Sequence, residues 1–190
     1  MADAKDSSMV DSNAPNSSIS HHNTFFMTHS NILRILAIAL SAASIAVTTT
    51  NKETVVLFTM LFDARFYYSS SLKFFVAANA VVCALSVVTL IMNFLLGKQA
   101  SQRKEYYLFL FIHDILMTVL LMAGCAAATA IGYVGQFGED HMGWLPMCDH
   151  VRKFCTTNLI SVVLSYLAFF AYLGLNILTA HRCISFAPKN

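Results

Sequence analysis

Two charged residues stand inside long hydrophobic stretches of this sequence, and their types make them the first candidates for chemistry. Arg34 lies in the first stretch and Asp114 in the third. A charge within hydrocarbon costs roughly 2.5–3.5 kcal/mol on insertion scales, so each of the two is expected to have a partner or a function. If both lie in the same half of a bilayer on parallel helices, the guanidinium could form a two-pronged ion pair with the carboxylate.

Two other interpretations of these charges remain open. Arg34 is close to the start of its stretch, so its side chain could extend to the phosphate layer instead. The side chain of Asp114 is too short to reach the phosphate layer, which favours the ion pair. Alternatively, Asp114 and the adjacent His113 could belong to a proton or ion path. Neighbouring helix residues point about 100° apart, so these two are not expected to form one site alone. The polar residues that other spans could add to such a path are Asn79, Asn93 and Asn176.

A polar segment near the end of the chain carries the second candidate group, Cys148 and Cys155. Two cysteines this close in an oxidising compartment most simply form a disulfide, which would fix a short loop. Zinc binding is the alternative, although the spacing matches no standard zinc template. The additional ligands would come from His141, Asp149 and His150.

Composition indicates what kind of protein must position these groups. Of the 190 residues, 57% are hydrophobic and 12% are charged, and the mean hydropathy is +0.61. A soluble domain carries about twice that share of charged residues. The net charge of +2 is too small and too scattered to suggest a nucleic-acid partner. We therefore expect an integral membrane protein whose main partner is the lipid bilayer, with no cofactor and no metal.

The hydrophobic pattern predicts an all-α membrane protein: a four-transmembrane-helix bundle with both termini cytoplasmic. Each stretch approaches or exceeds the ~20 apolar residues that a spanning helix needs. The predicted order is a disordered cytoplasmic tail, four spans within a domain covering 31–183, and a cytoplasmic tail; the corresponding ranges are 1–30, 31–50, 73–96, 106–132, 157–180 and 184–190.

The orientation follows from the connections between spans. The connection after the second span carries Lys98, Arg103 and Lys104. Basic residues next to span ends mark the cytoplasmic side, which places the cysteine segment outside. Trp144 in that segment is expected to anchor it at the outer surface, because tryptophan is enriched at membrane interfaces.

Small residues in the third span could allow close helix packing. Gly124, Ala128 and Gly132 recur at intervals of four, a spacing that lets helix backbones approach each other in lipid. Packing within one bundle explains the pattern more simply than packing between copies. Cys183, after the last span, could be palmitoylated or could be an ordinary interfacial cysteine.

Over residues 30 to 183 the sequence resembles the CASP-like proteins of the plant Casparian strip membrane domain family. That family has a basic residue in the first span and an acidic residue in the third, as this chain has. Its second span often opens with aromatic residues and a variant of Val-Ala-Asn-Ala, its first outer loop often starts with Thr-Asn-Lys, and its second carries one Trp and two Cys. The matching residues are Phe74-Phe75-Val76-Ala77-Ala78-Asn79-Ala80, Thr50-Asn51-Lys52, Trp144, Cys148 and Cys155.

The resemblance implies a multi-pass plasma-membrane protein that forms homo- or hetero-oligomers with itself and related four-span proteins. It also implies a non-enzymatic scaffold that gathers cell-wall-modifying enzymes at a membrane domain. The segment from Glu53 to Met60 only partly matches strip-forming members, which points to a CASP-like relative. A small transporter or channel that uses Asp114 is the alternative. A membrane enzyme is disfavoured, because the sequence holds no nucleophile–base pair or metal ligands at a usable spacing.

Overall fold

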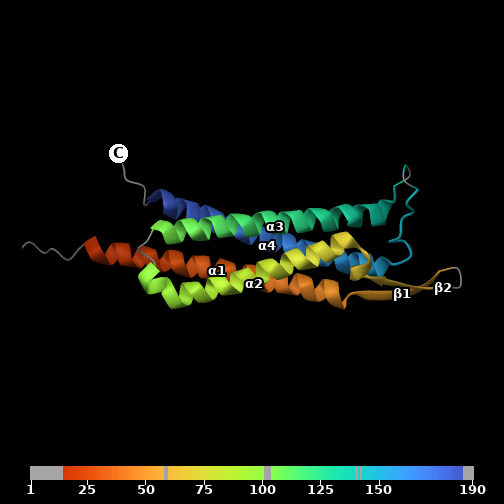
Figure 1. Ribbon diagram of the computed structural model, residues 1–190, viewed down its shortest axis with the longest axis horizontal. Coiled ribbons are helices and arrows are strands. Elements are labelled where there is room, and N and C mark those ends of the chain that lie inside the picture. Colours follow the sequence, from red (N-terminus) through yellow and green to blue (C-terminus); the bar gives the residue numbers. More distant parts are fainter. Residues whose placement is uncertain (1–14, 58–59, 101–103, 140, 142, 186–190) are drawn as a thin grey trace, which may run out of the picture.

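Four long helices make up most of the computed structural model, which describes residues 15–57, 60–100, 104–139, 141 and 143–185. They lie side by side in an elongated bundle (Figure 1). The start of α1 and the end of α4 are at one end of the bundle, here called the terminal end. The opposite end is called the hairpin end. The helices are α1 (Pro15–Thr50), α2 (Ser70–Ala100), α3 (Lys104–Phe137) and α4 (Arg152–Ser185).

Each of the four helices contains a stretch long and apolar enough to cross a membrane. The mean hydropathy of these stretches is between 1.9 and 2.4. A helix satisfies its own backbone groups, which hydrocarbon requires of a lipid-exposed spanning segment. The structure therefore confirms the predicted four-span, all-α membrane protein. The stretches run over Thr28–Thr50, Ser70–Leu95, Glu105–Phe137 and Arg152–Ile184.

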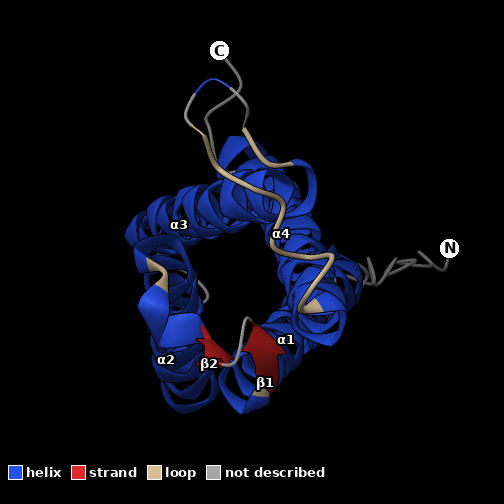
Figure 2. Cartoon of the chain, turned by 90° about the vertical axis from the view of Figure 1, so that its right-hand side faces the viewer, coloured by secondary structure: helices blue, strands red, loops and turns tan. Residues whose placement is uncertain are grey.

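The helices form a ring in which each packs against two neighbours. Viewed along the bundle, α1 lies between α2 and α4, and α3 also lies between α2 and α4 (Figure 2). Consequently α1 and α3 stand on one diagonal of the ring, and α2 and α4 on the other. A side chain that joins helices on the same diagonal must cross the interior of the bundle.

Polar and apolar residues are arranged in the opposite way from a soluble protein. The interior holds fully buried polar side chains such as Arg34, Asn79 and Asp114 beside apolar ones such as Phe75 and Leu121. The exterior carries large apolar side chains, including Leu95, Leu116, Phe170 and Ile177. This apolar exterior implies that the helices contact the lipid bilayer directly.

A β-hairpin, which was not predicted from the sequence, joins α1 to α2. Strand β1 (Lys52–Leu57) pairs antiparallel with β2 (Met60–Arg65), with Lys52 opposite Arg65 and Leu57 opposite Met60. A single 3-10 turn, η1 (Phe66–Tyr68), leads into α2. An isolated two-stranded hairpin is marginally stable in water, so this one needs support from the bundle.

Helix α1 begins at Pro15, within the segment 1–30 that the sequence predicts to be disordered. Proline suits a first helical turn because its missing N–H would have no helical partner there. Once the spanning part of α1 has formed, each further residue adds a hydrogen bond without a new nucleation cost, which explains the extension. At the other terminus α4 continues to Ser185. Residues 1–14 and 186–190 of the predicted tails lie outside the described residues.

Candidate functional site: an ion pair across the bundle interior

The structure brings Arg34 of α1 and Asp114 of α3 together in the bundle interior. Nη2 of Arg34 lies 2.9 Å from Oδ2 of Asp114 and 2.9 Å from Oδ1. Both side chains are 0% exposed. Because α1 and α3 are diagonal partners, the long arginine side chain crosses the interior to reach the carboxylate. The contact therefore links two helices that share little direct packing.

The ion pair differs in detail from the two-pronged bond predicted from the sequence. One guanidinium nitrogen, Nη2, contacts both carboxylate oxygens, whereas Nε and Nη1 of Arg34 are buried with no hydrogen-bond partner in the described structure. A two-pronged bond needs two nitrogens presented side by side. Since Arg34 reaches across the ring, its guanidinium approaches end-on. The opposite charges still compensate each other in a region of low dielectric.

His113 also contacts Asp114, although adjacent residues on one helix were not expected to form one site alone. Nδ1 of His113 lies 3.1 Å from Oδ1 of Asp114, and Nε2 lies 3.2 Å from the hydroxyl of Thr89 on α2. The imidazole is long enough to turn back toward its neighbour despite the angle between their Cα–Cβ bonds. A carboxylate accepts hydrogen bonds, so Nδ1 is the donor in this contact. Helix α2 thus joins the site through Thr89.

The fourth helix joins through Asn176. Its Nδ2 donates to the hydroxyl of Thr118 over 2.7 Å and lies 3.4 Å from the backbone oxygen of Asp114. The hydroxyl of Thr118 in turn donates to that same backbone oxygen over 2.7 Å. All four helices therefore contribute polar groups to the hydrogen bonds around Asp114. Hydrogen bonds of this kind hold helices together in lipid, where no hydrophobic effect drives them to associate.

Further buried hydroxyl and amide groups join the helices along the bundle, and the sequence interpretation missed most of them. Serine and threonine were not predicted to form polar contacts between helices. Their spacing, as in Ser41, Ser44 and Thr48, nevertheless indicates a buried polar stripe along one helix face. Tyrosine hydroxyls were also overlooked. The contacts are Ser44 and Thr48 with Ser161, Asn79 with Ser165, Ser86 with Tyr172, and Asn93 with Tyr106.

A disulfide joins Cys148 and Cys155 at the hairpin end, with their Cα atoms 5.8 Å apart. Because both sulfur atoms are in the disulfide, neither is a thiolate that could bind zinc. No group of three or more histidine, cysteine, aspartate or glutamate side chains could hold a metal ion among the residues that the structure describes. His141 is instead almost fully exposed, with Nδ1 3.5 Å from Oε1 of Glu139.

The loop before the disulfide is fixed by backbone hydrogen bonds and presents Trp144 outward. Glu139 and Trp144 exchange N–H···O bonds of 2.8 and 3.0 Å, which pairs their backbones. Gly138 precedes this pair with φ +72°, and a Cβ there would lie 2.6 Å from the carbonyl oxygen of Trp144. A larger residue would not fit. The indole of Trp144 is half exposed, in a position to meet an interface or a partner.

Two residues near the start of β1 attach the hairpin to α4. Oε2 of Glu53 accepts a 2.6 Å hydrogen bond from the backbone N–H of Phe154, and Nδ2 of Asn51 donates to the carbonyl oxygen of Phe154 over 2.9 Å. The N–H of Phe154 is in the first turn of α4 and has no partner within that helix. The side chain of Glu53 thus caps α4 from a distant part of the sequence. No local pattern predicted this contact.

The three small residues of α3 have different surroundings. A Cβ on Gly124 would lie 3.2 Å from the Cβ of Ala78, so α2 and α3 approach closely there. Ala128 is buried in the core. Gly132 has nothing within 4 Å of its missing side chain. The described packing therefore uses two of the three positions. Cys183 is partly exposed with a free thiol.

These features define a class of protein: a four-span membrane protein whose helices are joined by a buried ion pair and whose water-exposed loop is closed by a disulfide. The model for the Casparian strip membrane protein domain matches residues 25–171. That range covers more than half of the chain. It includes the ion pair and both cysteines.

Curated relatives agree with the match to the family model. The chain is 48% identical to CASP-like protein 1F2 of Ricinus communis, over 83% of this chain and 78% of the relative. It is 46% identical to CASP-like protein 1F3 of Populus trichocarpa, over 83% and 81% of the two chains. Identity to CASP-like protein 1F1 of Arabidopsis thaliana is 35%, over 78% and 85%. The chain belongs to the CASP-like family, which confirms the resemblance seen in the sequence. No solved structure matches it.

Proposed function

We propose that this protein is a non-enzymatic scaffold of the plasma membrane that self-associates into membrane domains. The observation that carries this proposal is the fully buried pair of Arg34 and Asp114. Each charge is compensated by the other, so the pair serves to fix the helices in one arrangement. A bundle with a fixed arrangement can present the same lipid-facing surface to every neighbouring copy.

The proposal includes an orientation and a set of partners. The basic residues Lys98, Arg103 and Lys104 in the connection between the second and third spans support a cytoplasmic location for both termini. The hairpin, Trp144 and the loop closed by Cys148 and Cys155 then face the cell wall, where oxidising conditions favour the disulfide. The partners are further copies of the chain, related four-span proteins and cell-wall-modifying enzymes. Gly132, with free space at its Cα, is available to a neighbouring helix.

Lateral mobility in plant cells tests the scaffold. A fluorescent fusion of the full chain is bleached in a small area of the plasma membrane, and its recovery is measured together with chemical crosslinking of the same cells. A scaffold gives slow or incomplete recovery and a ladder of crosslinked copies. A four-span protein of unrelated family, expressed at the same level, is the control. Rapid recovery without crosslinked copies would refute the proposal.

Transport is the second candidate, and one contact favours it. Asp114 contacts His113, which contacts Thr89, so a short chain of hydrogen-bonded groups runs from α3 to α2. Purified protein in liposomes with an internal pH dye tests this directly. Proton flux that Asp114→Asn abolishes would establish transport. Equal leak in protein-containing and protein-free liposomes would leave the scaffold as the function.

A further inference from the structure

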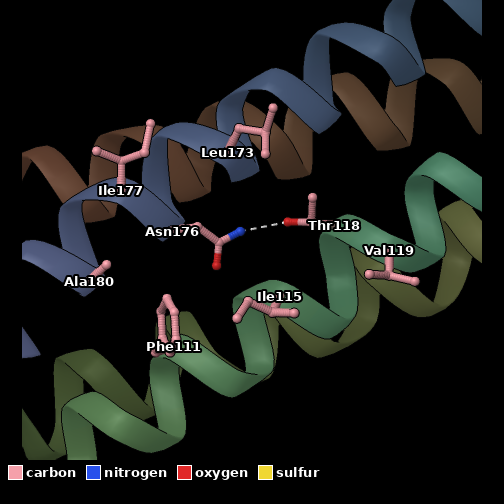
Figure 3. Close-up of a pocket in the computed structure, with 8 residues that line it drawn as sticks. All are labelled: Phe111, Ile115, Thr118, Val119, Leu173, Asn176, Ile177 and Ala180. Atoms are coloured by element: carbon pink, nitrogen blue, oxygen red, sulfur yellow. Dashed lines mark hydrogen bonds between the residues drawn. The ribbon is translucent and has the colours of Figure 1, made fainter.

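We propose that the groove between α3 and α4 binds a sterol, with the sterol hydroxyl donating a hydrogen bond to Oδ1 of Asn176. The groove lies on the outer surface of the bundle and has a volume of about 350 Å³ (Figure 3). Six of its lining side chains are apolar and two are polar. The lining residues are Phe111, Ile115, Thr118, Val119, Leu173, Asn176, Ile177 and Ala180.

The amide of Asn176 has a fixed orientation that leaves its oxygen unpaired. Nδ2 donates to the hydroxyl of Thr118 and, over 3.0 Å, to the backbone oxygen of Tyr172. Oδ1 is buried and has no hydrogen-bond partner in the described structure. In Figure 3 it points away from Thr118, toward the side of the groove where Phe111 lies. An unpaired carbonyl oxygen within hydrocarbon is unfavourable, so a ligand that supplies a donor would be bound selectively.

The chemistry of the bilayer selects the occupant. An acyl chain fills an apolar groove but carries no donor, and the ester groups of diacyl lipids accept hydrogen bonds without donating them. A sterol combines a rigid apolar body with one neutral hydroxyl that donates. The lipid-facing side chains Leu36 of α1 and Leu85 and Val88 of α2 are apolar, so those faces of a second copy would bring no donor.

The depth of Asn176 is also compatible with a sterol hydroxyl. Asn176 stands five residues before the exposed His181, about 8 Å along the axis of α4. The hydroxyl would thus lie just inside the polar layer at the terminal end, and the sterol rings would extend along Leu173 and Val119. Because groove side chains cover Oδ1, one of them must turn aside to admit the hydroxyl. Rotations of this kind at lipid-facing positions occur within nanoseconds.

Photolabelling of the full-length protein tests the site. The protein is placed in phosphatidylcholine nanodiscs with a sterol that carries a diazirine and an alkyne, and labelled peptides are identified by mass spectrometry. We expect saturable labelling within 111–119 and 173–180, competed by unlabelled sterol. The 3α-hydroxy epimer has the same hydrocarbon with a displaced hydroxyl, and we expect it to compete roughly fivefold more weakly, as the loss of one hydrogen bond predicts. Equal competition by the epimer would overturn the proposal.

Replacing either of two alanines by phenylalanine localises the binding. Ala180 lines the groove, and Ala180→Phe fills it; Ala84 is exposed on α2, and Ala84→Phe is the matched control. Labelling should fall several-fold in the first variant and stay unchanged in the second, with both checked for folding by size-exclusion chromatography. Unsaturable labelling, or labelling spread over α2, would refute the site. Crosslinks that place a second copy in the groove in sterol-containing discs would refute it as well. If Ala180→Phe does not fold, the epimer comparison on the native chain still decides.

Discussion

The buried interior of the bundle and its hairpin end are stabilised by different interactions. In the interior, the helices are joined by side-chain contacts: the pair of Arg34 with Asp114 and the hydrogen bonds around it. At the hairpin end the stabilising interactions are a disulfide, a two-stranded sheet and a side-chain cap on the backbone of α4. The two regions share the same helices, but not the same solvent.

The difference follows from what each solvent permits. Hydrocarbon offers no hydrophobic effect between helices, and it makes a compensated charge pair strong and an uncompensated charge costly. Water screens exposed ion pairs to about 0–1 kcal/mol, so such pairs would hold the hairpin end poorly. A covalent disulfide is not screened by water. Each region therefore uses the interaction that is effective where it lies.

The largest effect is expected when one member of the ion pair is removed. Asp114→Leu leaves the guanidinium of Arg34 buried without its acceptor, which costs about 3–5 kcal/mol. We expect little folded protein and loss of export to the cell surface, measured by size-exclusion chromatography in detergent and by surface biotinylation. Ile115→Leu, at the neighbouring lipid-facing position, is the control.

Two double variants show whether the charge itself matters. Arg34→Leu with Asp114→Leu removes both charges and should recover most of the folded protein, since an apolar pair can replace a buried ion pair. The swap Arg34→Asp with Asp114→Arg should recover part of it. If neither double variant folds better than Asp114→Leu alone, the side chains do not act as a pair.

The disulfide should rank second. Replacing Cys148 and Cys155 by alanine releases a loop whose ends are 7 residues apart, and the chain-entropy estimate for such a loop is about 2.5 kcal/mol. Thermal unfolding in detergent should show a lower midpoint for this variant, and reducing agent should lower the native midpoint to match it. Cys83→Ala, which removes a free thiol and no disulfide, serves as the control. A midpoint that is insensitive to reduction would show that the bundle alone holds the loop.

The cap on α4 should contribute less. Glu53→Ala removes the acceptor of the Phe154 N–H and should cost about 1–2 kcal/mol, the usual value of a helix cap that carries a charge. Hydrogen exchange at the start of α4 should become faster in this variant and remain unchanged in Lys52→Ala, whose side chain is exposed. Equal exchange in both variants would mean that the hairpin does not stabilise α4.

The smallest expected effects on stability are those of replacing two glycines of α3, and they should have opposite signs. In Gly124→Ala the new methyl would press on Ala78 of α2, and the net cost should be about 1 kcal/mol after the gain in helix propensity. In Gly132→Ala there is free space, so the isolated protein should gain roughly 0.5–1 kcal/mol. If Gly132→Ala nevertheless reduces crosslinking between copies, that position packs against a neighbouring copy.

Several structural features followed from the sequence because they depend on local composition. The four spans were predictable, since about 20 apolar residues in a row have few alternatives to a membrane helix. The two intramembrane charges were recognisable as candidates because such residues are costly in lipid. The hairpin was not predicted, because its support comes from the contacts of Asn51 and Glu53 with α4, about 100 residues away in the chain.

The sequence by itself determined that this chain spans a membrane four times and carries opposite charges within two of those spans, because hydropathy and charge act residue by residue. The tertiary structure decided that α1 and α3 lie on a diagonal, so that Arg34 crosses the interior and meets Asp114 end-on. It also decided that His113 turns back to the same carboxylate and contacts Thr89, and that Thr118 and Asn176 bond the backbone oxygen of Asp114. These contacts depend on the order of helices around the ring and on their relative rotation, and side-chain packing between helices sets both.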